Sequence, residues 1–429
     1  MEQTTVKKTT DFGLCTSCSS CKGICPRDCI HWISKDGMFL PEIDKDACIS
    51  CGLCASVCPG LGHSYEPRED AAETVTGQYL ACFNAWSKDP NIRHTGASGG
   101  VITTMVKMLL EQGLYDSVFC LDTYDYRHLL ETKRYTREEW PVMSGMKSRY
   151  LPVSHEQAIH YMKEHRQERI ILIATSCALR GILAVIDRLK LNRENYLLIG
   201  LFCDKVFNYN VISYFEDRFC QGQRLEALHF KNKESGGWPG DMKMYPENGE
   251  AFYVPIGERG RVKEYFMPER CLYCVDKLNV FADISLGDNY TGSYSSELGS
   301  NSVMIRSNRG MVAWEAVQSG LEAYPVDVAQ IQKAQYLEGR LNNLYFGDLK
   351  SAETGMDLNA GIPRELSAEE FRWVWKRNAQ KLSAGAQFNS DPSILEKQMR
   401  RDNKKPNPVI VFAKRCYYFA KRKLARLVK

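Results

Sequence analysis

The 429-residue sequence predicts an α+β protein: a small cysteine-rich N-terminal module, an α/β domain, and a helical, basic C-terminal tail. Three observations predict this organisation. One cysteine pattern occurs twice near the N-terminus, the middle of the chain alternates buried strands with amphipathic helices, and the chain becomes helical and highly charged from about residue 364. Metal-binding loops need little apolar core, whereas a strand–helix–strand order indicates a layered α/β domain.

The N-terminal repeat reads C-x-x-C-x-x-C-x-x-x-C-P and begins at Cys15 and again at Cys48. In two-cluster ferredoxins the fourth cysteine of each run ligates the other cluster. The pattern therefore predicts a bacterial-type ferredoxin module for two 4Fe-4S clusters, with two zinc sites as the alternative. Cys29 falls outside the pattern and is expected to be a small core residue. The predicted ligand sets are Cys15, Cys18, Cys21 and Cys58 for one cluster, and Cys48, Cys51, Cys54 and Cys25 for the other.

The composition excludes several classes of protein. Hydrophobic residues make up 44% and charged residues 25% of the chain, which is typical of a globular protein rather than a fibrous or disordered one. The longest apolar stretch, over 170–186, is interrupted by polar residues including Arg180, so no membrane span is expected. The N-terminal sequence lacks the apolar region of a secretory signal. We therefore expect a cytoplasmic protein whose 17 cysteines serve mainly as metal ligands rather than disulfides.

Hydrophobic patterning predicts the elements of the α/β domain. A glycine turn opens an amphipathic helix over 101–113. Buried strands are expected over 169–176 and 195–203, with a helix over 181–190 between them. The sequence also predicts hairpin strands, with an ENG turn as the clearest signal, in the segments 228–233, 240–254 and 262–267.

Four further cysteines lie at the ends of these elements. Cys177 and Cys203 each follow a buried strand, and Cys271 and Cys274 form a C-x-x-C pair. Because the ends of parallel strands converge on one edge of a sheet, the four thiols could close a third metal site. The alternative is two buried cysteines and a chance C-x-x-C.

Between Phe83 and Asn308 a series of short sequence blocks occurs in a characteristic order: ASGG at 97–100, SRY at 148–150, TSC at 175–177 with Gly181, GLFC at 200–203, GGWPGDMK at 236–243, CLYC at 271–274 and ADISLGD at 282–288. In these blocks and their order the chain resembles the β-subunit family of coenzyme F(420) hydrogenases and dehydrogenases. That family also includes chlorophyll-cycle reductases and bacterial members found with polysaccharide synthesis.

The resemblance implies FAD and a third 4Fe-4S cluster, held by Cys177, Cys203, Cys271 and Cys274. It also implies a division of the chain into a ferredoxin domain (1–70), an N-terminal family region with the flavin loop (78–155), a C-terminal family region with FAD and the third cluster (156–345), and a helical, basic extension (346–429).

The sequence departs from the family pattern near the expected flavin and substrate. Ser176 and Ala178 flank the first cysteine of the third set, where many members have Pro and Gln. Arg149 replaces a common Lys, and the segment 289–292 replaces a common Trp. These differences leave the identity of the substrate open.

Several residues are candidates for contacts with the flavin. Glycines at the start of a helix let the backbone approach a diphosphate, and the free N–H groups there favour an anion; a plain helix cap is the alternative. Lys147 and Arg149 are expected to be electrostatic partners of the flavin, or else solvated charges. Asp283 and Asp288 could bind a ribityl hydroxyl or cap a turn. The full set of flavin candidates is Ser98, Gly99, Gly100, Lys147, Ser148, Arg149, Tyr150, Asp283 and Asp288.

These observations predict an iron-sulfur flavoprotein oxidoreductase. No G-x-G-x-x-G follows a predicted strand, which disfavours NAD(P)H as the direct hydride partner. Clusters carry single electrons while hydride transfer moves two, and a flavin can do both. We expect a ferredoxin-like one-electron carrier as partner, no nucleic acid, and hydride exchange with coenzyme F(420) or another small organic molecule. The alternatives are an electron-transfer subunit without its own substrate and a reductase of polysaccharide biosynthesis.

The C-terminal tail predicts a surface interaction. Residues 397–429 carry 12 Lys or Arg against one Asp, although the whole chain has a net charge of only +4. Over 409–429, apolar and basic residues lie on opposite arcs of a helix. The segment is therefore expected to dock on an anionic membrane surface, at the inner face of the membrane, or on a partner protein. A helix folded back onto the body is the alternative.

Overall fold

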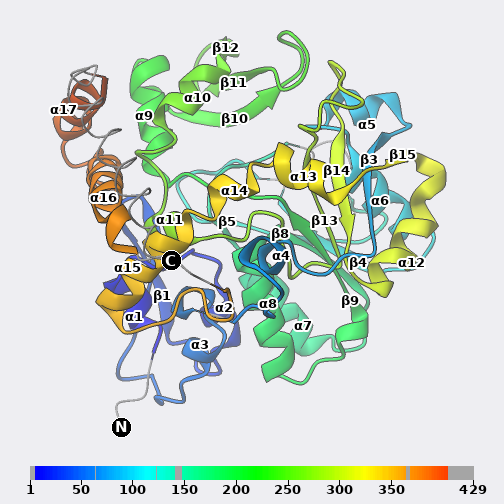
Figure 1. Cartoon of the computed structure of the whole chain (residues 1–429), viewed down its shortest axis with the longest axis horizontal. Helices are drawn as coiled ribbons and strands as arrows, with labels where there is room; N and C mark the ends of the chain where they lie inside the picture. The colour runs from blue at the N-terminus through cyan, green and yellow to red at the C-terminus, as the bar shows by residue number, and fades with distance from the viewer. Residues whose placement is uncertain (1–4, 63, 122, 141–146, 364–367, 404–429) are drawn as a thin grey trace, which may run out of the picture.

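The computed structural model describes residues 5–62, 64–121, 123–140, 147–363 and 368–403. An eight-stranded mixed sheet forms the centre of the molecule (Figure 1). Its order is β15-β3-β14-β13-β9-β8-β4-β6. These strands are β3 (Ala81–Ser87), β4 (Ser117–Cys120), β6 (Lys133–Tyr135), β8 (Ile170–Thr175), β9 (Tyr196–Leu201), β13 (Ile284–Asp288), β14 (Asn301–Ile305) and β15 (Leu321–Pro325).

Strands β13, β9, β8 and β4 are parallel and make up the middle of the sheet, whereas β6, β14, β3 and β15 are joined to their neighbours by antiparallel pairing. The predicted strands over 169–176 and 195–203 are confirmed as β8 and β9, and they are buried along almost their whole length. Both faces of a parallel sheet are covered, which explains their continuous apolar sequences. The carboxyl ends of these strands share one edge, which becomes the floor of the site.

Alternate residues of β8 and β9 face two different cores. Ile171 and Leu197 pack with helices α6 (Val101–Glu111) and α12 (Asn308–Val317) on one face. Leu172 and Leu198 pack with α7 (Glu156–Glu164) and α8 (Ser176–Arg188) on the other. The sheet thus lies between two helical layers, and the helix predicted over 101–113 is confirmed as α6.

A separate three-stranded sheet lies away from the N-terminal module, at the top of Figure 1. It contains β10 (Leu225–Asn232), β11 (Asp241–Pro246) and β12 (Phe252–Val254), as the hairpin signal predicts. The strand predicted over 262–267 is wrong, because α10 (Ile256–Val262) ends there and the following residues form turns. Val262 and Phe266 are both buried in the hairpin core, and the Phe266 N–H donates to the Val262 carbonyl at 3.3 Å, as in a turn of helix rather than a strand.

The N-terminal module packs against the second helical layer. It contains α1 (Lys7–Asp11), α2 (Ser20–Ile24), β1 (Ile30–Lys35), β2 (Met38–Ile43) and α3 (Leu53–Ser56). Helix α2 lies on α7 so closely that a Cβ at Gly23 would come within 2.8 Å of the Ile159 side chain. Gly181 of α8 makes a similar close approach to Ser20. The module is therefore fixed to the α/β domain by direct backbone proximity.

A late segment of the chain closes over the end of the module. Ser64 forms an isolated parallel β-bridge with Ala360, and the Tyr65 N–H donates to the Ala360 carbonyl at 2.9 Å. Gly62 has a φ of +93°, and a Cβ there would lie 2.5 Å from the Asp357 carbonyl oxygen. Residues almost 300 positions apart therefore share one small piece of backbone pairing.

The helices after residue 340 run along one side of the molecule from the module to the small sheet (Figure 1). Helix α15 (Asn343–Thr354) packs on α11 (Glu269–Tyr273) and crosses the domain boundary predicted at residue 345. The helical, charged region predicted from about residue 364 is confirmed for α16 (Arg372–Ala386) and α17 (Pro392–Asn403). The amphipathic helix predicted over 409–429 lies outside the described residues.

No helix within the described ranges is long and apolar enough to cross a membrane. The other elements are α4 (Ala71–Thr76), α5 (Pro90–Thr95), β5 (Leu130–Glu131), β7 (Val153–Ser154), α9 (Asn210–Phe219), α13 (Val328–Ala334) and α14 (Leu337–Arg340).

Candidate redox site

The two cysteine runs of the module fold into loops with the same backbone geometry. The second and fourth residues after the first cysteine of each run have positive φ: Ser17 and Ser19 in one run, Ser50 and Gly52 in the other. Short helices α2 and α3 follow immediately. This turn gathers three cysteines in a few residues, which is what a cubane cluster needs from one loop.

One cavity of the module is lined by Cys25, Cys48, Cys51 and Cys54, which we call the outer cage. These four cysteines are the set predicted for the second cluster. Cys51 is exposed to solvent. Cys29 also lines this cavity, and its Sγ atom lies 3.5 Å from that of Cys25. Sequence reasoning placed Cys29 in the core, and it is indeed buried, but its position beside four candidate ligands was missed.

The other set, which we call the inner cage, comprises Cys15, Cys18, Cys21 and Cys58. Burial raises the pKa of the Cys58 thiol to about 12, and the nearby Cys18 thiol contributes to the rise. The pKa values of Cys15 and Cys21 are raised by burial and by the charge of Cys58. Such mutual repulsion requires the four sulfurs to lie close together. Buried thiolates are stable only with a positive centre among them, so this donor set fits an iron-sulfur cluster.

The third cysteine set lies where the sequence places it, at the carboxyl edge of the sheet. Cys177 follows β8, Cys203 follows β9, and Cys271 and Cys274 belong to α11 and its C-cap. All four line one cavity of about 500 Å³. Burial raises the pKa of Cys177 to about 12, with contributions from the charges of Cys18, Cys271 and Cys274.

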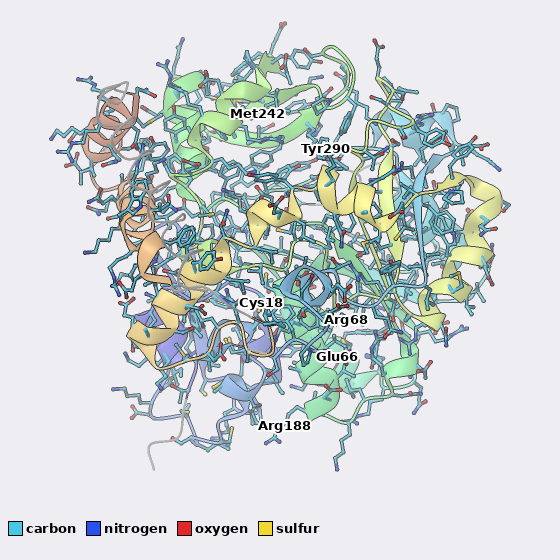
Figure 2. The ribbon with its side chains drawn as sticks, in the orientation of Figure 1. Cys18, Glu66, Arg68, Arg188, Met242 and Tyr290 are labelled. Atoms are coloured by element: carbon cyan, nitrogen blue, oxygen red, sulfur yellow. The ribbon has the colours of Figure 1, made fainter. Side chains whose placement is uncertain are left out.

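Cys18 connects the inner cage to the third set. It lines the 500 Å³ cavity and interacts electrostatically with Cys177. Figure 2 shows Cys18 near the middle of the molecule, where the module meets the α/β domain. The His155 N–H donates to the Cys18 carbonyl at 3.2 Å, which ties the loop to the start of α7. The inner cage is therefore adjacent to the third set. It is also close to the outer cage, because the charges of Cys21 in the inner cage and Cys54 in the outer cage interact.

Three arginines line the same cavity as the third cysteine set. Arg180, Arg270 and Arg340 each have a buried guanidinium nitrogen without a hydrogen-bond partner: Nη1, Nη1 and Nε, respectively. Burial and the nearby charge of Arg270 lower the pKa of Arg180 to about 9. Burial alone would lower the pKa of Arg340, but the charges of Cys274, Asp204 and Cys203 raise it above its usual value. Arg340 also pairs with Asp204, at 3.6 Å. Buried guanidinium nitrogens without a hydrogen-bond partner beside four thiols fit an anionic group, such as a thiolate-ligated cluster.

Across the described residues, no three potential ligands are spaced to hold a single metal ion. A cubane spreads its four ligands around four irons, so its cage is wider than a mononuclear site.

The glycine loop before α6 lies at another part of the same cavity. Ser98 and Gly100 line it, and Gly100 occupies the helix N-cap with a φ of +78°. The Ser98 hydroxyl donates to the Ser300 carbonyl at 2.8 Å, and the Lys233 ammonium donates to the Ser98 carbonyl at 2.7 Å. The loop is thus held in place from β14 and from the small sheet.

Gly99 packs against the sheet, and its expected contact with the flavin stays a prediction. A Cβ at Gly99 would lie 2.8 Å from the Ala85 carbonyl oxygen and 2.8 Å from Asn301 Oδ1. The residue therefore packs against β3 and β14, and it is not among the residues that line the cavity. A side chain there would displace the loop from the sheet, so the need for glycine comes from packing.

The residues 147–150 form part of the cavity wall. Arg149 lies 3.9 Å from the ring centre of Tyr124 and donates to the Lys147 carbonyl at 2.6 Å. The Tyr150 ring packs edge-on against Phe230. Burial lowers the pKa of Lys147. Lys147, Ser148, Arg149 and Tyr150 are thus brought together with Ser98 and Gly100, as the sequence predicts.

The two aspartates of the ADISLGD block are separated by the length of β13. Asp288, at the carboxyl end, lines the cavity and forms an ion pair with buried Lys231. This pair lowers the pKa of Asp288 although burial alone would raise it. Asp283, at the other end, pairs with Arg193 at 2.9 Å and Arg309 at 3.1 Å. Asp283 is therefore held in an ion-pair network away from the cavity lining, and its contact with a flavin stays a prediction.

Sequence reasoning missed most of the cations of the cavity. Nine Lys or Arg side chains line it against three Asp, which favours anionic ligands. Lys231 could have been suspected as a site residue, because it is a charged residue within a predicted hairpin strand. Arg340 carried none, because it reaches the site from a helix more than 60 residues after Cys274. The cations missed by sequence reasoning are Arg180, Lys205, Lys231, Arg259, Lys263, Arg270 and Arg340.

The fold and site define an iron-sulfur protein with a two-cluster module fixed to an α/β domain. Three family models match the chain: a 4Fe-4S dicluster domain over residues 14–60, and the N-terminal and C-terminal parts of "Coenzyme F(420) hydrogenase/dehydrogenase, beta subunit" over residues 82–160 and 167–329. The chain belongs to the coenzyme F(420) hydrogenase/dehydrogenase β-subunit family and carries an N-terminal 4Fe-4S dicluster domain.

Curated relatives agree with this assignment. The chain is 26% identical to the beta subunit of coenzyme F(420) hydrogenase from Methanosarcina barkeri, over 58% of this chain and 84% of that protein. It is 23% identical to the protein of the same name from Methanothermobacter thermautotrophicus, over 59% and 87%. One component of the F(420)H(2) dehydrogenase of Methanosarcina mazei is 24% identical, over 56% of this chain and 63% of that protein.

The fold is similar to one chain of a solved complex, the F(420)-reducing NiFe hydrogenase from Methanosarcina barkeri. The TM-score is 0.50 at 20% sequence identity, and the match covers 68% of this chain and 98% of the other. At this identity the likeness concerns the fold alone.

Proposed function

We propose that this protein carries single electrons through three 4Fe-4S clusters to FAD, which exchanges a hydride with an organic substrate. One observation carries the proposal: the third cysteine set and the glycine loop open into one cavity of about 500 Å³, and Cys18 of the inner cage lines it as well. Small-molecule pockets commonly measure about 300–1,000 Å³. A bound flavin supplies the conversion between one-electron and two-electron transfer.

The order of the three cysteine sets supports an entry point at the module surface. The outer cage includes exposed Cys51, the inner cage includes buried Cys18 and Cys21, and Cys18 interacts electrostatically with Cys177 of the third set. Electrons from a ferredoxin-like carrier or a partner subunit would enter at the outer cage and leave the inner cage through Cys18. The thiols of the third set would hold the last cluster beside the flavin.

The residues of the cavity would bind and orient the flavin. The backbone N–H groups at the start of α6 and the side chains of Lys147 and Arg149 provide positive charge for a diphosphate. The Lys231–Asp288 ion pair fixes a buried ammonium at the end of β13. Arg180, Arg270 and Arg340 would balance the charge of the third cluster.

We propose coenzyme F(420) or another organic hydride acceptor as the substrate, because the relatives are named for coenzyme F(420). Residues 289–292 follow Asp288 directly, and Tyr290 is half exposed there (Figure 2). This segment departs from the common family pattern and would therefore contribute to substrate choice.

Anaerobic purification followed by iron, sulfide and flavin analysis tests the proposal. We expect about 12 iron atoms and about 12 sulfides per chain, together with FAD. The loaded protein should reduce or oxidise a deazaflavin with an artificial one-electron dye. About eight iron atoms without flavin would refute the proposal and leave only a two-cluster protein.

A further inference from the structure

The outer cage contains one cysteine more than a cluster needs. A 4Fe-4S cluster takes four cysteine ligands, whereas five cysteines line the cavity: Cys25, Cys29, Cys48, Cys51 and Cys54. The side chain of Cys29 is within contact distance of Cys25, with 3.5 Å between the sulfurs, and it also contacts Cys48. Cys29 is therefore a member of the cluster of thiols and not an isolated core residue.

The position of Cys29 is fixed independently of any cluster. Cys29 is only 4% exposed, and its backbone carbonyl accepts a hydrogen bond from the Asp44 N–H at 2.9 Å. It packs with Val6 and Ile30 in a small core that the outer-cage cysteines border. A rigid backbone with the sulfur 3.5 Å from that of Cys25 means that either thiol can reach the same iron by a small movement of its side chain.

The other repeat has no equivalent thiol. Cys29 is four residues after Cys25, and the corresponding position four residues after Cys58 is Gly62. Gly62 has a φ of +93°, and a Cβ would lie 2.5 Å from the Asp357 carbonyl oxygen. The backbone of the inner cage therefore excludes a cysteine at this position, so the fifth thiol is a property of the outer cage alone.

We propose that Cys29 is an alternative ligand of the outer cluster and can replace Cys25 at its iron. The exchange moves no electrons: the Cys25 sulfur leaves the iron and takes a proton, while the Cys29 thiol loses its proton and binds the iron as a thiolate. The exposed cage, which includes Cys51, would thereby keep its cluster when Cys25 is lost as a ligand. This inference rests on the ligand sets of the proposed function.

The test uses four full-length variants: Cys25→Ala, Cys29→Ala, the double variant, and Cys58→Ala as the matched position of the inner cage. Alanine is used because it cannot bind iron. Each chain is reconstituted anaerobically with iron and sulfide, then analysed for iron, sulfide and the electron paramagnetic resonance of the reduced clusters. We expect Cys25→Ala and Cys29→Ala to keep the iron content of the wild type, and the double variant to lose about four iron atoms per chain.

Cys58→Ala separates the inference from the function on which it rests. It should lose about four iron atoms, because the inner cage has no fifth thiol. If Cys25→Ala loses as much iron as the double variant, the exchange proposal is refuted while the ligand sets stand. If Cys58→Ala and the double variant both keep all their iron, the ligand sets themselves are wrong. Cys25→Val, alone and with Cys29→Ala, repeats the comparison with another side chain that cannot bind iron should the alanine variant fail to fold.

Discussion

The outer and inner cages have the same cysteine pattern and the same left-handed turns, yet their surroundings differ. Cys51 of the outer cage is exposed, and a fifth thiol lies beside Cys25. In the inner cage Cys18 and Cys21 are buried, Cys18 interacts with Cys177 of the third set, and the Asp357 backbone lies against Gly62. In the proposed function the repeat therefore determines how a cluster is held, while the neighbouring elements determine what that cluster exchanges electrons with.

The largest expected effect comes from removing the third cysteine set, which lies next to the inner cage and not next to the outer cage. Cys271→Ser should remove the third cluster and reduce electron flow to the flavin by orders of magnitude, while dithionite still reduces both module clusters. Stopped-flow spectroscopy of flavin reduction measures this loss. Normal flavin reduction in this variant would show that the module clusters reach the flavin without the third set.

Iron release should distinguish the two cages directly. A chelator with a mild oxidant is expected to remove about four iron atoms first, from the outer cage, because Cys51 is exposed while Cys18 and Cys21 are buried. The remaining iron should leave several times more slowly. Release of all iron in one phase would contradict the difference in accessibility between the cages.

The contact between α2 of the module and α7 of the α/β domain is expected to be too close for a side chain at Gly23. Gly23→Ala places a Cβ 2.8 Å from the Ile159 side chain, so it should lower the free energy of unfolding by roughly 1–2 kcal/mol, even after the gain in helix propensity. Gly257→Ala in α10 is the matched control, because a Cβ there meets nothing within 4 Å. Chemical denaturation of both variants measures the difference, and equal stability would contradict the close packing of α2 on α7.

The smallest expected effect is a change in the midpoint potential of the third cluster when the positive charge of Arg340 beside it is removed. Arg340→Gln removes a buried cation near Cys203 and Cys274, so the midpoint potential of the third cluster should become more negative by roughly 60 mV, a tenfold change for one electron. Arg340→Lys should restore most of the shift. Arg218→Gln, an exposed charge on α9, should leave the potential unchanged in the same redox titration.

The sequence predicted those parts of the molecule where chemistry and local pattern coincide. The cysteine repeat determines its own loop, and β8 and β9 are recognisable because strands buried on both faces are continuously apolar. Cys177 and Cys203 could be placed together because both follow parallel strands. The convergence of the third set in one cavity agrees with that expectation, and its ligand role stays a proposal.

Other features depend on contacts that no local pattern encodes. Gly99 is needed because of the backbone at Ala85 and Asn301, which are distant in sequence. Asp283 belongs to the same block as Asp288, but five residues of strand carry the two to opposite edges of the sheet. Arg340 reaches the third set only through the packing of α14. The segment 262–267 was misassigned because its buried residues follow a turn of helix rather than a strand.

The pairing of Ser64 and Tyr65 with Ala360 sets an order of events during synthesis. The module emerges from the ribosome first, but the segment that closes over it is made almost 300 residues later, about 15–60 s at typical elongation rates of ~5–20 residues per second. During that interval the cysteine loops have no cover at the Gly62 side. The cluster proposed for the inner cage would therefore be loadable while the chain is still growing, before the last stretch of backbone completes its wall.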